Sequence, residues 1–70
     1  MTEDQIKFRK FLITVYQDQR NDMIRTIVWL ANHFPHLPRE VHAAYLRLSS
    51  PERNAVIQEV CMMGDVANGD

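Results

Sequence analysis

Apolar residues recur at spacings of three and four along most of this chain, and no stretch alternates apolar and polar residues with a period of two. Spacings of three and four place side chains on one face of an α-helix, whereas a half-buried strand needs the alternation of two. Glycine, which interrupts regular structure, is absent before Gly64. The sequence therefore predicts an all-α fold.

The predicted fold is a compact bundle of three or four short helices. They cover about residues 2–18, 22–33, 38–48 and 51–63. Thr2 and Gln5 form a capping box at the start of the first helix. Pro35 ends the second helix, and Pro38 suits the first position of the third because its missing N–H is not needed there. Gly64 is predicted to end the fourth helix as its C′ residue.

The polar run over residues 17–22 separates the first two helices. We expect a turn there, with Asn21 as the N-cap of the second helix. One continuous helix to Phe34 is the alternative, because the run contains no strong helix breaker. Residues 1–64 are predicted to form a single domain, and residues 65–70 a frayed, flexible tail.

The start of the fourth helix has two predicted caps. Ser50 can cap it with Pro51 at the first helical position, or Ser49 can cap it while Glu52 closes a capping box. Both alternatives place a tight turn between the third and fourth helices.

The inward face of each helix follows from a rotation of about 100° per residue. The predicted core positions are Phe8, Phe11, Leu12, Val15 and Tyr16; Met23, Ile24, Ile27, Val28, Leu30, Ala31 and Phe34; Val41, Ala44, Tyr45 and Leu48; and Val56, Ile57, Val60 and Met63. The second helix is the most apolar and is predicted to form the centre of the core. A core of this size is marginal, so self-association or binding to a larger partner is expected to add stability.

Trp29 lies outside the apolar arc predicted for the second helix, on a face that also carries Arg25 and His33. A tryptophan beside an arginine on a polar face has the composition of a binding hot spot. We therefore expect these three residues to form an interface with another protein. The alternative is that the second helix is buried on nearly all sides and Trp29 packs inside the chain.

Other large apolar residues also fall outside the predicted core faces. Ile6 and Ile13 are one heptad apart, a spacing that places them on one face and favours a helix–helix seam between two copies of the chain. Leu46 lies opposite Leu48 and is a further predicted interface residue. We expect a homodimer through Ile6 and Ile13; the alternative is that both residues belong to a wide core face of the first helix.

The sequence offers little for catalysis or metal binding. His33, His36 and His42 follow an H-x2-H-x5-H pattern through a proline-containing connection, which lacks the paired ligands typical of zinc sites. Cys61 is predicted near the C-terminal end of a helix, where the dipole disfavours a thiolate. No glycine-rich phosphate loop precedes Gly64. We expect no enzyme activity, no metal and no cofactor.

Cysteine usage and hydropathy predict a cytoplasmic protein without a membrane segment. One cysteine cannot form an internal disulfide, which fits a reducing compartment. The longest stretch without a charged residue, Thr26 to Pro38, has thirteen residues, fewer than the roughly 20 that a membrane span requires.

Nucleic-acid binding is the alternative function. The third and fourth helices resemble a helix-turn-helix unit in their lengths and short turn, and Arg53, Asn54 and Gln58 would then contact DNA bases. The formal net charge of −1 argues against this reading, because DNA-binding domains usually carry a basic surplus.

The sequence therefore predicts a small non-catalytic regulator, an inhibitor or adaptor, that docks on a larger protein. Chains of this size without catalytic residues are frequent among phage and other mobile-element proteins, which makes such an origin an expectation. A small DNA-binding transcriptional regulator is the second hypothesis.

Overall fold

The structure is a computed structural model that describes residues 1–67, with side chains described through residue 63. Its elements are α1 (Glu3–Asp18), α2 (Met23–His33), the 3₁₀ turn η1 (Phe34–His36), α3 (Arg39–Arg47) and α4 (Ser50–Ala67). No strand occurs among these residues. The predicted all-α fold is confirmed, and the first two helices are separate.

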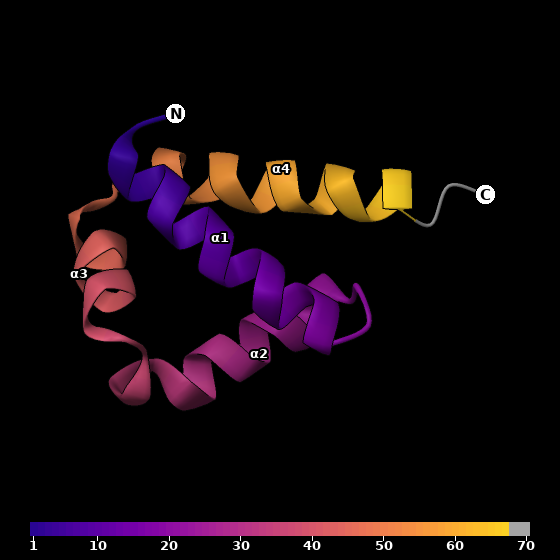
Figure 1. Cartoon of the computed structure of the whole chain (residues 1–70), viewed down its shortest axis with the longest axis horizontal. Helices are drawn as coiled ribbons and strands as arrows, with labels where there is room; N and C mark the ends of the chain where they lie inside the picture. The colour runs from indigo at the N-terminus through magenta and orange to yellow at the C-terminus, as the bar shows by residue number, and fades with distance from the viewer. Residues whose placement is uncertain (68–70) are drawn as a thin grey trace.

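Helix α1 is the element that the other helices share. It packs against α2, α3 and α4, and in Figure 1 α4 and α2 lie on either side of it while α3 closes one end. The buried core residues are Phe8, Leu12, Val15, Tyr16, Leu30, Leu37, Ala44, Leu48, Val56 and Val60. Most of them occupy the inward faces predicted for α1, α3 and α4.

A sharp turn joins α1 to α2. Arg20 and Asn21 both have positive φ angles, 58° and 59°, and the Asn21 N–H donates to the Tyr16 carbonyl at 2.8 Å. Asparagine tolerates this left-handed region better than most residues. The predicted N-cap at Asn21 is therefore wrong by one residue: the Asp22 side chain caps α2 by accepting from the Arg25 N–H at 3.2 Å.

The predicted capping boxes are present at the starts of α1 and α4. Gln5 Oε1 accepts from the Thr2 N–H at 2.8 Å, and Thr2 Oγ1 accepts from the Gln5 N–H at 3.2 Å. At α4 the Ser49–Glu52 alternative is the one formed, with hydrogen bonds of 2.8 and 3.3 Å. The Ser49 N–H, followed by the Ser49 hydroxyl, lowers the pKa of the Glu52 carboxyl.

The predicted end of α4 at Gly64 is wrong. The helix continues through Gly64 to Ala67, which includes three residues of the predicted tail. Glycine inside a helix costs only about 1 kcal/mol relative to alanine, so without a following proline it is a weak stop signal. The remainder of the predicted tail, residues 68–70, lies outside the described residues.

The predicted inward face of α2 is wrong in part: Leu30 is buried and Met23 and Phe34 pack against the core, but the other predicted positions are exposed. Ile24 is 79% exposed and Val28 is 54% exposed, whereas Thr26 is fully buried. Thr26 can be buried because its hydroxyl donates to the Asp22 carbonyl at 2.8 Å, which satisfies the polar group within the helix. Met63 was predicted in the core of α4 and is likewise exposed.

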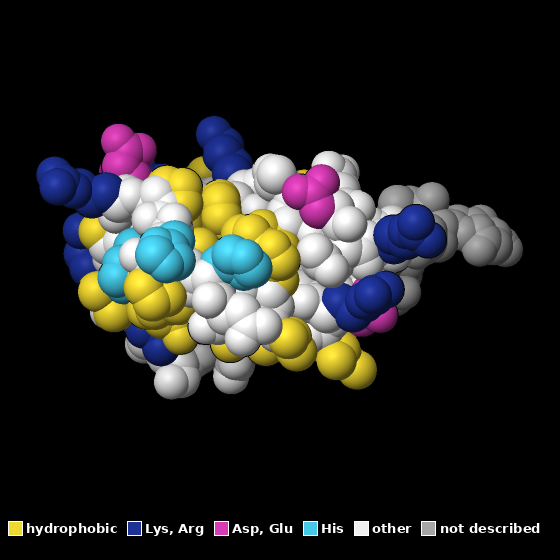
Figure 2. All heavy atoms as spheres, turned by 90° about the horizontal axis from the view of Figure 1, so that it is seen from below, with side chains coloured by type: hydrophobic (Ala, Val, Ile, Leu, Met, Phe, Trp, Pro, Cys, Tyr) yellow, Lys and Arg dark blue, Asp and Glu magenta, His cyan; other side chains and the backbone are white. Residues whose placement is uncertain are grey.

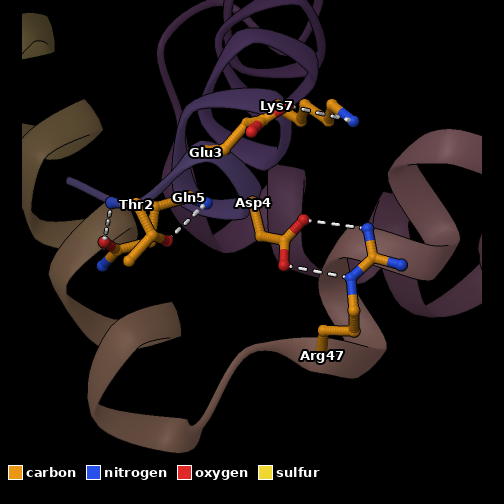
Figure 3. Close-up of polar contacts among 6 residues, drawn as sticks. All are labelled: Thr2, Glu3, Asp4, Gln5, Lys7 and Arg47. Atoms are coloured by element: carbon orange, nitrogen blue, oxygen red, sulfur yellow. Dashed lines mark hydrogen bonds and ion pairs between the residues drawn. The ribbon is translucent and has the colours of Figure 1, made fainter.

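Charged side chains join the start of α1 to the end of α3 (Figure 3). Arg47 donates from Nε and Nη2 to the two carboxylate oxygens of Asp4, at 3.0 and 2.9 Å. This paired geometry is the stronger form of an arginine–carboxylate contact. In the same view Lys7 pairs with Glu3 of its own helix at 3.9 Å, with the Glu3 side chain 86% exposed.

The Asp4–Arg47 contact makes stability depend on pH. The Arg47 hydrogen bond lowers the pKa of the Asp4 carboxyl in the folded chain. A lowered carboxyl pKa contributes stability above the unfolded value, near pH 4, and this stability is lost as the pH falls through the folded pKa. Asp4→Asn is expected to lower the free energy of unfolding at pH 7, by an amount that shrinks as the pH falls below about 4.

Urea unfolding of both proteins between pH 3 and pH 7 measures this difference. Glu3→Gln is the matched control, because its exposed pair with Lys7 should contribute little. A difference between Asp4→Asn and the unchanged protein that stays constant across the series would contradict the role assigned to Asp4.

Candidate protein-docking site

Helix α2 presents an apolar stripe to solvent. Its residues Ile24, Ile27, Val28 and Ala31 are exposed, the first three by 79%, 40% and 54%. They follow the i, i+3, i+4, i+7 spacing of one helix face. Figure 2 views the molecule from the side on which α2 lies, and groups of hydrophobic side chains are visible on part of that face, next to histidines. We call these four residues the α2 stripe.

A groove adjoins the α2 stripe and separates α2 from α4. It has a volume of about 360 Å³. Ile27, Leu30, Ala31 and Phe34 line it on one side, Ser50, Arg53, Asn54 and Ile57 on the other, and Phe8, Leu37 and Tyr45 complete its lining. Because Ile27 and Ala31 belong to both features, the stripe and the groove form one continuous surface.

Arg53 is held in place on the α4 side of this groove. Its guanidinium carbon lies 3.9 Å from the centroid of the Tyr45 ring, and Nε and Nη2 donate to the Tyr45 carbonyl at 3.1 and 2.8 Å. That carbonyl belongs to the last turn of α3 and also accepts from the Leu48 N–H at 3.2 Å. Arg53 thus adds side-chain donors from the following helix to the C-terminal end of α3.

The sequence predicted Trp29 on a polar outer face, but the structure places it against the core. It is partly buried and packs against the core, with its ring centroid 6.2 Å from that of Phe11. His33 stacks on it at 4.1 Å and donates from Nδ1 to the Trp29 carbonyl at 2.8 Å. Trp29 and His33 thus pack together as part of the chain's own structure, while Arg25 is exposed beside them in sequence.

The structure separates the remaining predicted interface residues. Ile6 is 36% exposed and Leu46 is 62% exposed, but Ile13 is partly buried and packs against the core. The predicted Ile6–Ile13 seam therefore has one exposed member. Asn54 and Gln58, which were predicted to contact DNA, are exposed on α4.

The three histidines and the cysteine were the remaining candidates for metal binding or catalysis. Among the described residues no group of three or more His, Cys, Asp or Glu side chains is placed to hold a metal ion. His42 packs edge-on against the Phe34 ring at 4.5 Å. Cys61 is a partly buried free thiol. In the part of the chain that the structure describes, no helix combines the length and hydropathy needed to cross a bilayer.

Sequence reasoning missed the α2 stripe because it assigned these residues to the core. A signal was present: apolar or aromatic side chains extend around α2 from Trp29 to Val28, roughly 260° at 3.6 residues per turn. An arc that wide exceeds what one packed face can cover. The chain buries the side of α2 that includes Thr26 and Leu30, and the rest of the arc remains exposed.

The chain matches no protein-family model, no curated protein and no solved structure.

The stripe and Trp29 are expected to differ in what they contribute to folding. Trp29→Ala should lower the free energy of unfolding by roughly 1–3 kcal/mol, because a large, partly buried ring leaves the core. Ile24→Ala should change it by less than about 0.5 kcal/mol, since that side chain is mostly in water. Chemical denaturation followed by far-ultraviolet circular dichroism measures both values. A larger loss for Ile24→Ala than for Trp29→Ala would show that α2 packs the other way round.

Proposed function

We propose that this chain is a small non-catalytic regulator, an inhibitor or adaptor, that docks on a larger protein through the α2 stripe and the adjoining groove. The observation that carries the proposal is the exposure of four apolar residues at helical spacing beside a preformed groove. Contiguous apolar surface of this kind typically marks an interaction site. Helix-in-groove recognition uses the same i, i+3, i+4, i+7 anchors.

The energetics of the stripe favour binding over folding as its role. Ile24 and Val28 are largely exposed, so they contribute little to the stability of the isolated chain. Covering a large aliphatic side chain on binding contributes about 1.5–3 kcal/mol. A partner that covers the α2 stripe would therefore bury apolar surface that folding leaves exposed to water, and this burial would favour binding.

DNA binding through α4 is less well supported. A base-reading arginine must reach into the major groove, whereas Arg53 is directed back onto Tyr45 by two hydrogen bonds and a ring contact. Asn54 and Gln58 are exposed but are uncharged, and phosphate contacts supply most of the affinity for DNA. DNA binding stays the second hypothesis from the sequence.

Self-association and location are part of the same proposal. A homodimer through Ile6 stays a prediction. It has less apolar surface available than the α2 stripe offers, because Ile13 already packs on the core.

The free thiol of Cys61 is compatible with a reducing compartment, and we place the binding event in the cytoplasm. A phage or other mobile-element origin remains an expectation from size alone.

A pair of matched variants tests the docking surface. Val28→Glu introduces a charge into the α2 stripe, and Leu46→Glu introduces the same charge outside it, at a similarly exposed apolar residue on α3. Both variants should fold like the unchanged chain. Used as baits in extracts of the organism that encodes the chain, the unchanged chain and Leu46→Glu should retain the same partner. Val28→Glu should lose it by tenfold or more, because a buried charge without a counter-ion opposes binding.

Quantitative mass spectrometry of the retained proteins gives the readout, and sedimentation of the purified chain reports its own oligomeric state. Retention of every protein at equal levels by the two variants would contradict the proposed site. A homodimer that Val28→Glu dissociates would show that the stripe pairs with a second copy, and this would overturn docking on a larger partner.

A further inference from the structure

The groove beside the α2 stripe carries one kind of charge. Arg53 is the only charged residue in its lining, and the lining contains no carboxylate. Among residues 1–63, whose side chains are described, no carboxylate lies within ion-pair distance of Arg53. Two other arginines have such partners: Arg9 pairs with Glu59, and Arg47 pairs with Asp4. Arg53 is thus a partly buried cation that pairs with no carboxylate among residues 1–63.

The geometry leaves donors of Arg53 for a ligand. A guanidinium has five N–H groups in a rigid planar fork. Two hydrogen bonds to the Tyr45 carbonyl use Nε and Nη2, so the Nη1 donors and the second N–H of Nη2 are left. The contact with the Tyr45 ring fixes the plane of the group. A carboxylate can bind such a held fork through two parallel hydrogen bonds, with little further loss of side-chain entropy.

The apolar part of the surface sets the form of the occupant. The α2 stripe extends along one helix face, and Arg53 lies across the groove on α4. An occupant that covers both needs apolar side chains repeating along its length and a carboxylate on the edge nearer α4. An amphipathic helix has this arrangement, with an apolar face bordered by charged residues.

We infer that the groove takes an amphipathic helix of the partner protein, and that an Asp or Glu on the edge of that helix pairs with Arg53. This inference rests on the proposed function, because it names the chemistry of the partner segment. It disfavours a second copy of α2 as the occupant. The α2 stripe is bordered on its outer edge by Arg25 and Asn32, so a second stripe would bring another arginine and no carboxylate.

A displayed library of amphipathic helices tests the inference with defined probes. Each peptide is about 18 residues long, about five turns, with fixed leucines on one face and flanking positions drawn from Glu, Lys and Gln. Selection on the unchanged chain, with counter-selection on Val28→Glu, retains peptides that use the stripe. The selected peptides are expected to carry Glu at one flanking position.

Single substitutions in a selected peptide then measure the contact by fluorescence anisotropy. Replacing that Glu by Gln should weaken binding by about 10- to 100-fold, the size expected for a charged hydrogen bond. The effect should vanish on Arg53→Gln and shrink on Arg53→Lys, which keeps the charge without the paired donors. Arg39→Gln changes an exposed arginine on α3 and serves as the control that keeps the full effect.

The possible results separate the two proposals. Selected peptides that need Val28 but show no preference for Glu would overturn the carboxylate contact and leave the docking site standing. A Glu preference that persists in full on folded Arg53→Gln would also overturn it. If both Arg53 variants fail to fold, the Glu-to-Gln change on the unchanged chain decides, and equal affinities refute the inference. A library with no peptide enriched on the unchanged chain over Val28→Glu would overturn the proposed function as well.

Discussion

The burial of α1 among the other three helices determines where every other element lies. Phe8 and Leu12 are almost completely buried, and α2, α3 and α4 each pack on this helix. A chain of 70 residues has few further elements with which to cover the outward faces of those three helices. Polar residues occupy much of the outward surface of α3 and α4. On α2 the outward face is apolar, and this leaves the α2 stripe in water.

Local signals in the sequence predicted the helices well because each depends on a few neighbouring residues. The Thr2–Gln5 capping box is an example, since both hydrogen bonds join residues three positions apart. The face of α2 could not be predicted in the same way. Thr26 is buried because its hydroxyl bonds to a carbonyl of its own helix, and nothing in the periodicity distinguishes such a threonine from one that faces water.

The candidate site shows the same division between local pattern and tertiary packing. The sequence predicted the interface at Trp29, a large aromatic residue, whereas in the structure the Trp29 ring packs against the rings of Phe11 and His33. From the sequence alone, Arg53 is predicted only as a residue that contacts DNA bases. Its position above Tyr45 and its lack of a carboxylate partner among the described residues depend on the turn between α3 and α4. Only the folded arrangement makes it a candidate anchor for a carboxylate.

The orientation of α2 is the central claim, and the exposure of individual methyl groups in solution measures it most directly. A soluble paramagnetic agent broadens the NMR signals of methyl groups that water can reach. With α2 oriented as in the structure, the methyl signals of Ile24 and Val28 should broaden strongly, and those of Val56 and Val60, which are fully buried on α4, should broaden little. Protection of Ile24 and Val28 equal to that of Val56, in a chain shown by sedimentation to be monomeric, would mean that α2 buries the opposite face and that the docking surface does not exist.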